Sequence, residues 1–242
     1  MKSFILHSIL LMIFSGIGVQ AQDSVNIYLL PGQGADGRLF KNLHIEGNYN
    51  AKVIEYSVPD KGMDMKAYAE LLAQQIDTTT EFILIGTSLG GMLATEISDF
   101  LNPQKTIIIS SAKNSMELPW RYNFQKKFPI YKLVGARISK FGARVLQPIV
   151  ESDRKYEKET FVAMLDDLDP TFLKRTIAMI LEWDRVENEA PIIHIHGSKD
   201  KTIPIKNVDY DLVIEDASHM LTLINSTELN TLLNQLLSGP TE

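Results

Sequence analysis

A serine between two glycines is the feature of this sequence most suggestive of chemistry. An apolar, β-branched run at residues 82–85 leads into a Gly-x-Ser-x-Gly pattern centred on Ser88, and a helix-like segment follows. This order is typical of a nucleophile elbow, a sharp strand-to-helix turn that exposes the serine at the carboxyl edge of a sheet. Gly86 and Gly90 carry no Cβ, so strand and helix can approach closely. The same five-residue pattern also occurs in ordinary turns, so evidence from the rest of the chain is needed to distinguish an elbow from a turn.

Two backbone N–H groups could stabilise negative charge that develops next to Ser88. Leu89 would begin the helix, where the helix dipole favours an anion. The loop after the first strand candidate is rich in glycine, and it could direct the N–H of Gln33 at the same oxyanion.

The same loop allows a different interpretation. Gly32, Gly34 and Gly37 match the G-x-G-x-x-G fingerprint of dinucleotide binding, with Glu55 as the acid for a ribose. Against this, Pro31 precedes the first glycine and the signal for the following helix is weak. The loop of a hydrolase sheet is the favoured interpretation.

Two histidines alternate on the strand candidate at residues 192–196. His194 and His196 therefore point to one face, and such a pair can hold a metal ion. Ser198 stands where the metallohydrolase pattern has an aspartate, so a hydrogen-bonded structural role for His196 is favoured. No metal and no cofactor is predicted.

The elements expected around these residues alternate in type. Strand candidates lie at 25–30, 53–56, 82–85, 106–110, 192–196 and 212–214, and helix candidates lie at 63–76, 89–101, 169–183 and 227–237. Strands that alternate with helices indicate βαβ units, and hence a mostly parallel sheet of about six strands flanked by helices.

Residues 112–190 break this alternation, because no β-rich run occurs and helix signals dominate. We expect a helical lid or cap there. Its first half is basic and its second half mostly acidic, which favours two solvated faces; the alternative is attraction to an anionic substrate or surface. Its aromatic residues, such as Trp120 and Tyr122, should pack the lid, and some should line a pocket beneath it.

Composition suits one exported globular domain. The chain has 242 residues, of which 45% are apolar and 22% charged, and it contains no cysteine. Lys2, the apolar run at 4–19 and Ala21 predict a signal peptide over residues 1–21, with an uncleaved membrane anchor as the alternative. Its removal would take away Lys2 and no acid, changing the net charge from −6 to −7. That charge argues against a nucleic-acid partner, and no stable membrane span is expected after cleavage.

Taken together, three segments resemble the α/β-hydrolase superfamily. They are Gly86-Thr87-Ser88-Leu89-Gly90-Gly91, then His196-Gly197-Ser198-Lys199-Asp200 with Ile203-Pro204, and finally Asp216-Ala217-Ser218-His219. The serine, acid and histidine come in the order that this fold uses. The resemblance covers the mature chain, 22–242, as a single domain with 112–190 inserted as the cap. Pro31-Gly32, where the family often has His-Gly, and Asp216, where it often has glycine, leave the subfamily open.

The resemblance implies a serine hydrolase that acts on carboxylic esters or related small acyl compounds, and the predicted signal peptide implies that it is secreted or periplasmic. Ser88 would attack the acyl carbon, His219 would take its proton, and Asp200 would orient the imidazole. The N–H groups of Gln33 and Leu89 would hold the oxyanion. A non-catalytic binder with the same fold and a dinucleotide-dependent oxidoreductase remain the alternatives.

Overall fold

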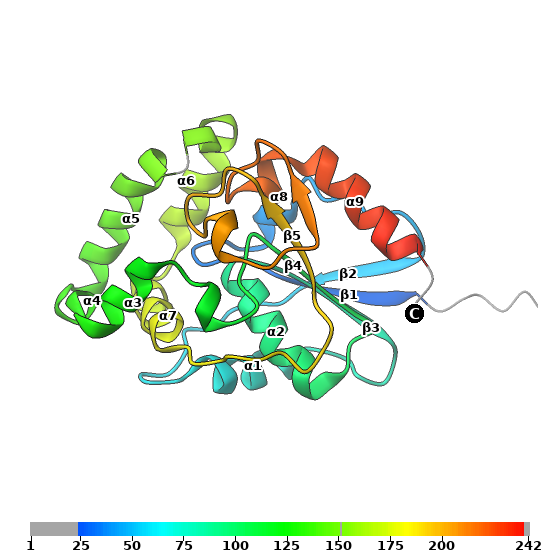
Figure 1. The fold of residues 1–242 in the computed structure, drawn as a ribbon, viewed down its shortest axis with the longest axis horizontal. Coiled ribbons are helices and arrows are strands. Elements are labelled where there is room, and N and C mark those ends of the chain that lie inside the picture. Colours follow the sequence, from blue (N-terminus) through cyan, green and yellow to red (C-terminus); the bar gives the residue numbers. More distant parts are fainter. Residues whose placement is uncertain (1–23, 151, 240–242) are drawn as a thin grey trace, which may run out of the picture.

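The computed structural model describes residues 24–150 and 152–239, so the predicted signal peptide lies outside the described residues (Figure 1). These residues form a six-stranded sheet of order β2-β1-β3-β4-β5-β6, in which every pairing is parallel. The strands are β1 (Val25–Leu30), β2 (Tyr49–Val53), β3 (Phe82–Thr87), β4 (Lys105–Ile109), β5 (Ile193–Gly197) and β6 (Leu212–Ile214). The predicted fold class is confirmed.

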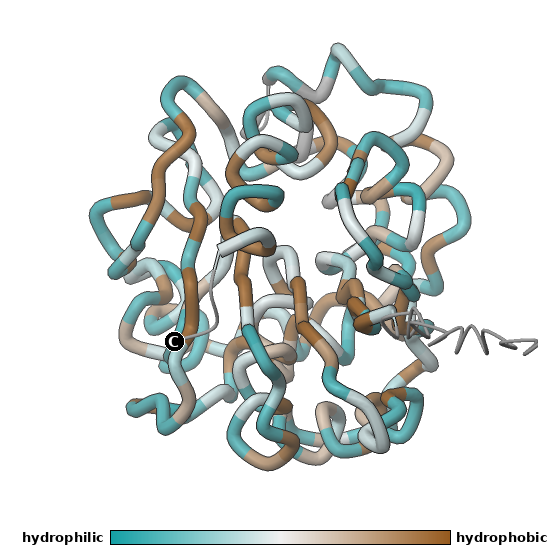
Figure 2. Tube along the Cα trace, turned by 90° about the vertical axis from the view of Figure 1, so that its right-hand side faces the viewer, coloured by the Kyte–Doolittle hydropathy of each residue, from teal (hydrophilic) through white to brown (hydrophobic). Residues whose placement is uncertain are grey.

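Helices cover both faces of the sheet, because its central strands are apolar on both sides. On one face, Leu84 and Ile108 pack with residues of α1 (Met65–Ala73) and α2 (Leu89–Leu101). On the other face, Ile83 and Ile85 pack with α9 (Ser226–Ser238), while the short α8 (Leu221–Ile224) leads into that helix. Figure 2 shows the apolar strands in the middle of the molecule, between more hydrophilic segments.

The second strand was predicted at 53–56, and the structure places β2 earlier, at Tyr49–Val53. β2 is an edge strand with a mostly exposed pattern, so its sequence carries little of the apolar signal that marks the inner strands. The N–H of Ile54 still bonds to Leu29 at 2.9 Å, but the backbone of Glu55 bonds to the side chain of Gln75 instead of the sheet.

Between β4 and β5 the chain is helical, in the segment where a cap was expected. The helices are α3 (Trp120–Lys127), α4 (Ile130–Leu133), α5 (Ala136–Val150), α6 (Lys158–Asp167) and α7 (Pro170–Glu182). Asp169 caps α7 by accepting hydrogen bonds from the N–H groups of Thr171 at 2.6 Å and Phe172 at 3.1 Å. In Figure 1 these helices form a layer on one side of the carboxyl ends of the strands.

Among residues 24–150 and 152–239, no helix has the length and apolar character that crossing a membrane requires.

Candidate active site

Ser88 stands at the turn between β3 and α2, in a strained backbone conformation. Its φ and ψ angles are 53° and −119°, which a residue with a side chain rarely adopts. Its N–H bonds to the carbonyl of Ile109 at 2.9 Å, and its own carbonyl accepts from the hydroxyl of Ser111 at 2.6 Å. These bonds from β4 and the residues after it hold the turn in place.

The flanking glycines are required by close packing. A Cβ on Gly86 would lie 2.2 Å from the carbonyl oxygen of Gly90, and one on Gly90 would lie 2.0 Å from that of Leu30. No side chain fits at either position without moving backbone. The pattern that predicted an elbow therefore reflects direct contact between α2, β3 and β1.

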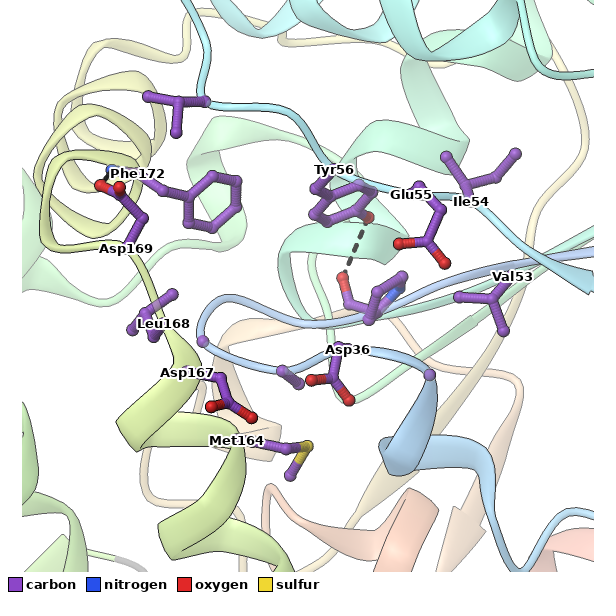
Figure 3. Close-up of a pocket in the computed structure, with 15 residues that line it drawn as sticks. Asp36, Val53, Ile54, Glu55, Tyr56, Met164, Asp167, Leu168, Asp169 and Phe172 are labelled. Carbon is purple, nitrogen blue, oxygen red and sulfur yellow. Dashed lines mark hydrogen bonds between the residues drawn. The ribbon is translucent and has the colours of Figure 1, made fainter.

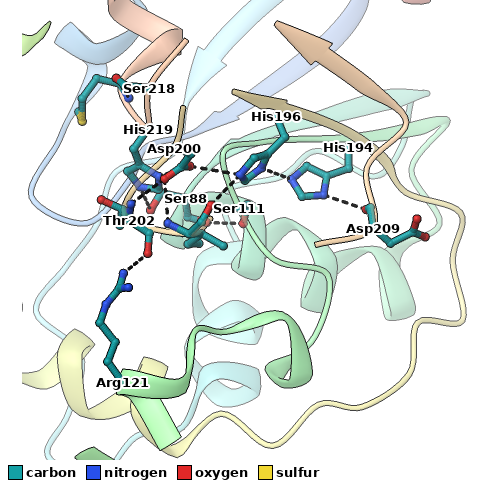
Figure 4. A network of polar contacts seen from close by, with 12 residues as sticks. Ser88, Ser111, Arg121, His194, His196, Asp200, Thr202, Asp209, Ser218 and His219 are labelled. Carbon is teal, nitrogen blue, oxygen red and sulfur yellow. Dashed lines mark hydrogen bonds and ion pairs between the residues drawn. The ribbon is translucent and has the colours of Figure 1, made fainter. Parts of the chain in front are cut away.

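Ser88, His219 and Asp200 form one hydrogen-bonded chain (Figure 4). The Nε2 atom of His219 lies 2.9 Å from the Oγ of Ser88, and its Nδ1 lies 2.7 Å from the Oδ2 of Asp200. An ionised carboxylate only accepts hydrogen bonds, so the imidazole hydrogen lies on Nδ1. Nε2 is then an acceptor directed at the serine hydroxyl.

The acid of this chain is buried and held by several donors. The Oδ1 of Asp200 accepts from the backbone N–H groups of Thr202 and Ile203, each at 2.8 Å. Burial alone would raise the pKa of this carboxyl. The electrostatic attraction of the neighbouring His219 ring, together with hydrogen bonds from His196 and His219, outweighs burial and holds the pKa of Asp200 well below its usual value.

Two buried histidines, His194 and His196, lie behind Asp200. The sequence predicted only that both point to the same face of their strand. The Nε2 of His196 lies 2.8 Å from the carbonyl oxygen of Ile203 and 3.3 Å from the Oδ2 of Asp200. Because the carbonyl can only accept, the hydrogen of His196 lies on Nε2, and its Nδ1 lies 3.0 Å from the Nε2 of His194. Burial lowers the pKa of His194 to about 3, so that ring is neutral at neutral pH.

Asp216, the other acid near His219 in sequence, lies elsewhere. Its exposed carboxylate pairs with Lys199 at 2.7 Å, and its backbone N–H bonds to the hydroxyl of Ser198. It adopts a φ of 61°, in keeping with a turn residue.

Both expected oxyanion donors come from segments next to Ser88. Leu89 is the first residue of α2, so its N–H has no partner within the helix. A Cβ on Gly32 would lie 3.3 Å from the Cβ of Ser88, which places the loop after β1 against the serine. The side chain of Gln33 in that loop donates to the hydroxyl of Thr176 on α7 at 2.7 Å and so ties the loop to the cap helices.

A cavity of about 600 Å³ opens over Ser88 and His219. Cap residues that line it are Arg121, Tyr122, Leu165, Leu168, Leu173 and Ile180. Of the aromatic residues considered from the sequence, Tyr122 lines this cavity, whereas the side chain of Trp120 is 76% exposed. Both lie at the start of α3, and the sequence did not distinguish the inward from the outward one.

A smaller cavity of about 210 Å³ lies on the other side of the loop after β1 (Figure 3). Four carboxylates border it, from Asp36, Glu55, Asp167 and Asp169. Arg38 pairs with both Asp36 and Asp167, at 2.5 and 2.8 Å. Neither Ser88 nor His219 lines this second cavity.

The glycine pattern at 32–37 lacks the context of a dinucleotide site. Gly37 begins a short 3-10 helix, Gly37–Phe40, and the next regular element is β2. The fingerprint requires a glycine loop that opens directly into an α-helix, whose N-terminus binds the pyrophosphate. The local structure therefore disfavours the dinucleotide interpretation.

Comparison with known proteins gives a partial match to one family and a fold. A family described as an uncharacterised protein family, UPF0227, matches residues 46–118. No curated protein sequence matches the chain significantly.

Solved structures match over nearly the whole chain. A thermophilic esterase from Thermogutta terrifontis with malate bound is 16% identical, with a TM-score of 0.64 over 89% of this chain and 90% of that one. The esterase EaEST from Exiguobacterium antarcticum is 15% identical, with a TM-score of 0.67 over 90% and 93%. An enol-lactonase from Burkholderia xenovorans LB400 is 12% identical, with a TM-score of 0.68 over 91% and 94%. At these identities the likeness establishes the fold, and the chain has the α/β-hydrolase fold.

Proposed function

We propose that this chain is a serine hydrolase that cleaves carboxylic esters through an acyl-enzyme intermediate. The observation that carries the proposal is the hydrogen-bonded chain from Ser88 through His219 to Asp200, beside a cavity large enough for a small acyl compound. The esterases and the lactonase of the same fold support it by analogy.

In the first half of the reaction, the Oγ of Ser88 forms a bond to the acyl carbon while the Nε2 of His219 takes the hydroxyl proton. The carbonyl oxygen becomes an oxyanion, which accepts hydrogen bonds from the N–H groups of Leu89 and Gln33. Collapse breaks the bond to the alcohol oxygen, which receives the proton from His219. The alcohol leaves, and the acyl group stays on Ser88.

In the second half, water attacks the acyl carbon and gives a proton to His219, and the bond to Ser88 Oγ then breaks. The carboxylic acid leaves and Ser88 regains its proton. Asp200 keeps the hydrogen of His219 on Nδ1 throughout and stabilises the imidazolium that forms in both halves. His196 and the two backbone N–H groups that bond Asp200 keep its carboxylate ionised.

The lining of the cavity predicts which residues set acyl preference. Tyr122→Ala should enlarge the cavity, and we expect kcat/KM for a long-chain activated ester to rise relative to an acetate ester by about tenfold. The matched control is Trp120→Ala, two residues away and directed to solvent, which should leave the chain-length profile unchanged. A panel of activated esters of graded length, with a lactone included, measures both variants. A profile that responds to Trp120 and not to Tyr122 would show that the acyl group lies elsewhere.

We also propose export, on the strength of the apolar run at 4–19 and Ala21. Protein recovered from an exporting host should have an intact mass that begins at or near Gln22. Retention of Met1 together with protein in the membrane fraction would contradict cleavage.

A further inference from the structure

Helices α3, α4 and α5 form the outer layer of the cap. Each of them packs against α7, which lies between them and the rest of the molecule. In Figure 1 they lie along the left margin, on the side of the molecule opposite α9. We call the solvent-facing side of these three helices the outer cap face.

Large apolar side chains gather on the outer cap face, where they are exposed to solvent. On α3 and α4, Trp120 is 76% exposed and Leu133 is 88% exposed. On α5, Ile138, Phe141 and Val145 are all exposed. They recur at the spacing of one helical face, and α5 uses its other side to pack on α7. Exposed apolar groups gathered on one face mark an interaction surface.

The same face is cationic. No Asp or Glu occurs from residue 118 to residue 150, whereas the chain as a whole has a net charge of −6. Besides Arg121, which lines the cavity over Ser88, six cations lie on its helices: Lys126, Lys127, Lys132, Arg137, Lys140 and Arg144. Lys132 pairs with Glu182 and Arg144 with Asp166. Within the described residues, Lys126, Lys127 and Arg137 form no ion pair.

From this combination we propose that the outer cap face docks on an anionic lipid surface. Helices with exposed apolar residues and Lys or Arg beside them lie in the membrane interface, where the apolar side chains enter the acyl boundary and the cations meet the headgroups. The occupant is a surface of negative charge, because the face offers cations and no carboxylate of its own. A second copy that met it through a two-fold axis would set like charges against each other.

Sedimentation with vesicles tests the proposal, on protein as recovered from an exporting host. We expect binding to vesicles of phosphatidylcholine mixed with phosphatidylglycerol at about 0.1 M salt. We expect much weaker binding to pure phosphatidylcholine, and a loss of binding as salt rises. The charge-reversal pair Lys126→Glu with Lys127→Glu should weaken partitioning by on the order of tenfold or more.

A matched pair of substitutions shows whether vesicle binding depends on the outer cap face or only on the net charge of the chain. Lys61→Glu with Lys66→Glu changes the chain by the same charge, but at exposed positions near the start of α1. These two should leave partitioning close to that of the unchanged protein. An equal loss in both pairs, or no binding of the unchanged protein to anionic vesicles, would overturn the proposal.

The apolar contribution is tested by Leu133→Ser with Phe141→Ser, two exposed positions whose change should preserve the unfolding temperature. This variant should also lose vesicle binding, while hydrolysis of a soluble acetate ester continues unchanged. Docking is thereby separated from the proposed reaction, on which it does not depend. Dimerisation without lipid, abolished by the same variant, would assign the face to a second copy and refute lipid docking.

Discussion

The Asp200→Asn variant is expected to lose on the order of 10⁴ in kcat on an activated ester, as the equivalent change does in serine proteases. The amide can keep an oxygen toward the N–H groups of Thr202 and Ile203, so the loop should hold its shape. Its NH₂ group would then face the Nδ1 of His219, where Oδ2 now accepts a hydrogen bond. This arrangement favours the tautomer with hydrogen on Nε2, which cannot take the proton of Ser88.

Asp216→Asn is the matched control, because it makes the same chemical change in the residue three positions before His219. Asp216 is exposed and pairs only with Lys199 among the described residues, and a surface ion pair of this kind contributes about 0–1 kcal/mol. We expect kcat close to that of the unchanged enzyme. Steady-state kinetics of the two variants on one ester makes the comparison. A large loss from Asp216→Asn with little loss from Asp200→Asn would mean that the acid is misassigned.

Gly90→Ala is expected to destabilise the fold by about 3 kcal/mol or more, a large effect for one methyl group. The added Cβ would lie 2.0 Å from the carbonyl oxygen of Leu30 and 2.6 Å from that of Pro31. Both contacts are with backbone, so relief requires α2 to move away from β1. The unfolding temperature should fall by roughly 10 °C, and activity should fall with it because α2 carries the elbow.

Gly142→Ala provides the control for this prediction. Gly142 lies within α5, and a Cβ there meets nothing within 4 Å. Alanine is favoured over glycine inside a helix by about 0.5–1 kcal/mol, so this variant should be slightly more stable. Thermal unfolding followed by circular dichroism measures both changes. If Gly90→Ala unfolds at the temperature of the unchanged protein, the packing of α2 on β1 is not as tight as described.

The sequence predicted best where one local requirement fixes the residue type. The elbow needs glycine on both sides of Ser88, and the contacts at Gly86 and Gly90 show why no other residue fits. Asp216 lies only three residues before His219, where a turn residue is expected, so Asp200 was the better candidate for the acid. In the structure, Asp200 follows the end of β5 and contacts His219.

Prediction was weaker where tertiary packing decides. Edge strand β2 carries polar residues because one side of it faces solvent. The apolar pattern therefore predicted this strand a few residues too late in the chain. Trp120 and Tyr122 lie two positions apart on α3, and only the packing of α3 on α7 places Tyr122 in the cavity and Trp120 in solvent. His196 bonds to the loop that carries Asp200 because this loop folds back against the end of β5. The spacing of residues in the sequence does not predict that contact.

Labelling with a serine-directed fluorophosphonate tests the proposed nucleophile most directly. The probe should add to Ser88 alone, with the adduct located by peptide mass, and the rate should rise with pH as the imidazole loses its proton and can act as a base. His219→Ala should abolish labelling, because an unassisted hydroxyl is a weak nucleophile. Adduct formation at another residue, or labelling that persists in Ser88→Ala, would contradict a nucleophilic Ser88.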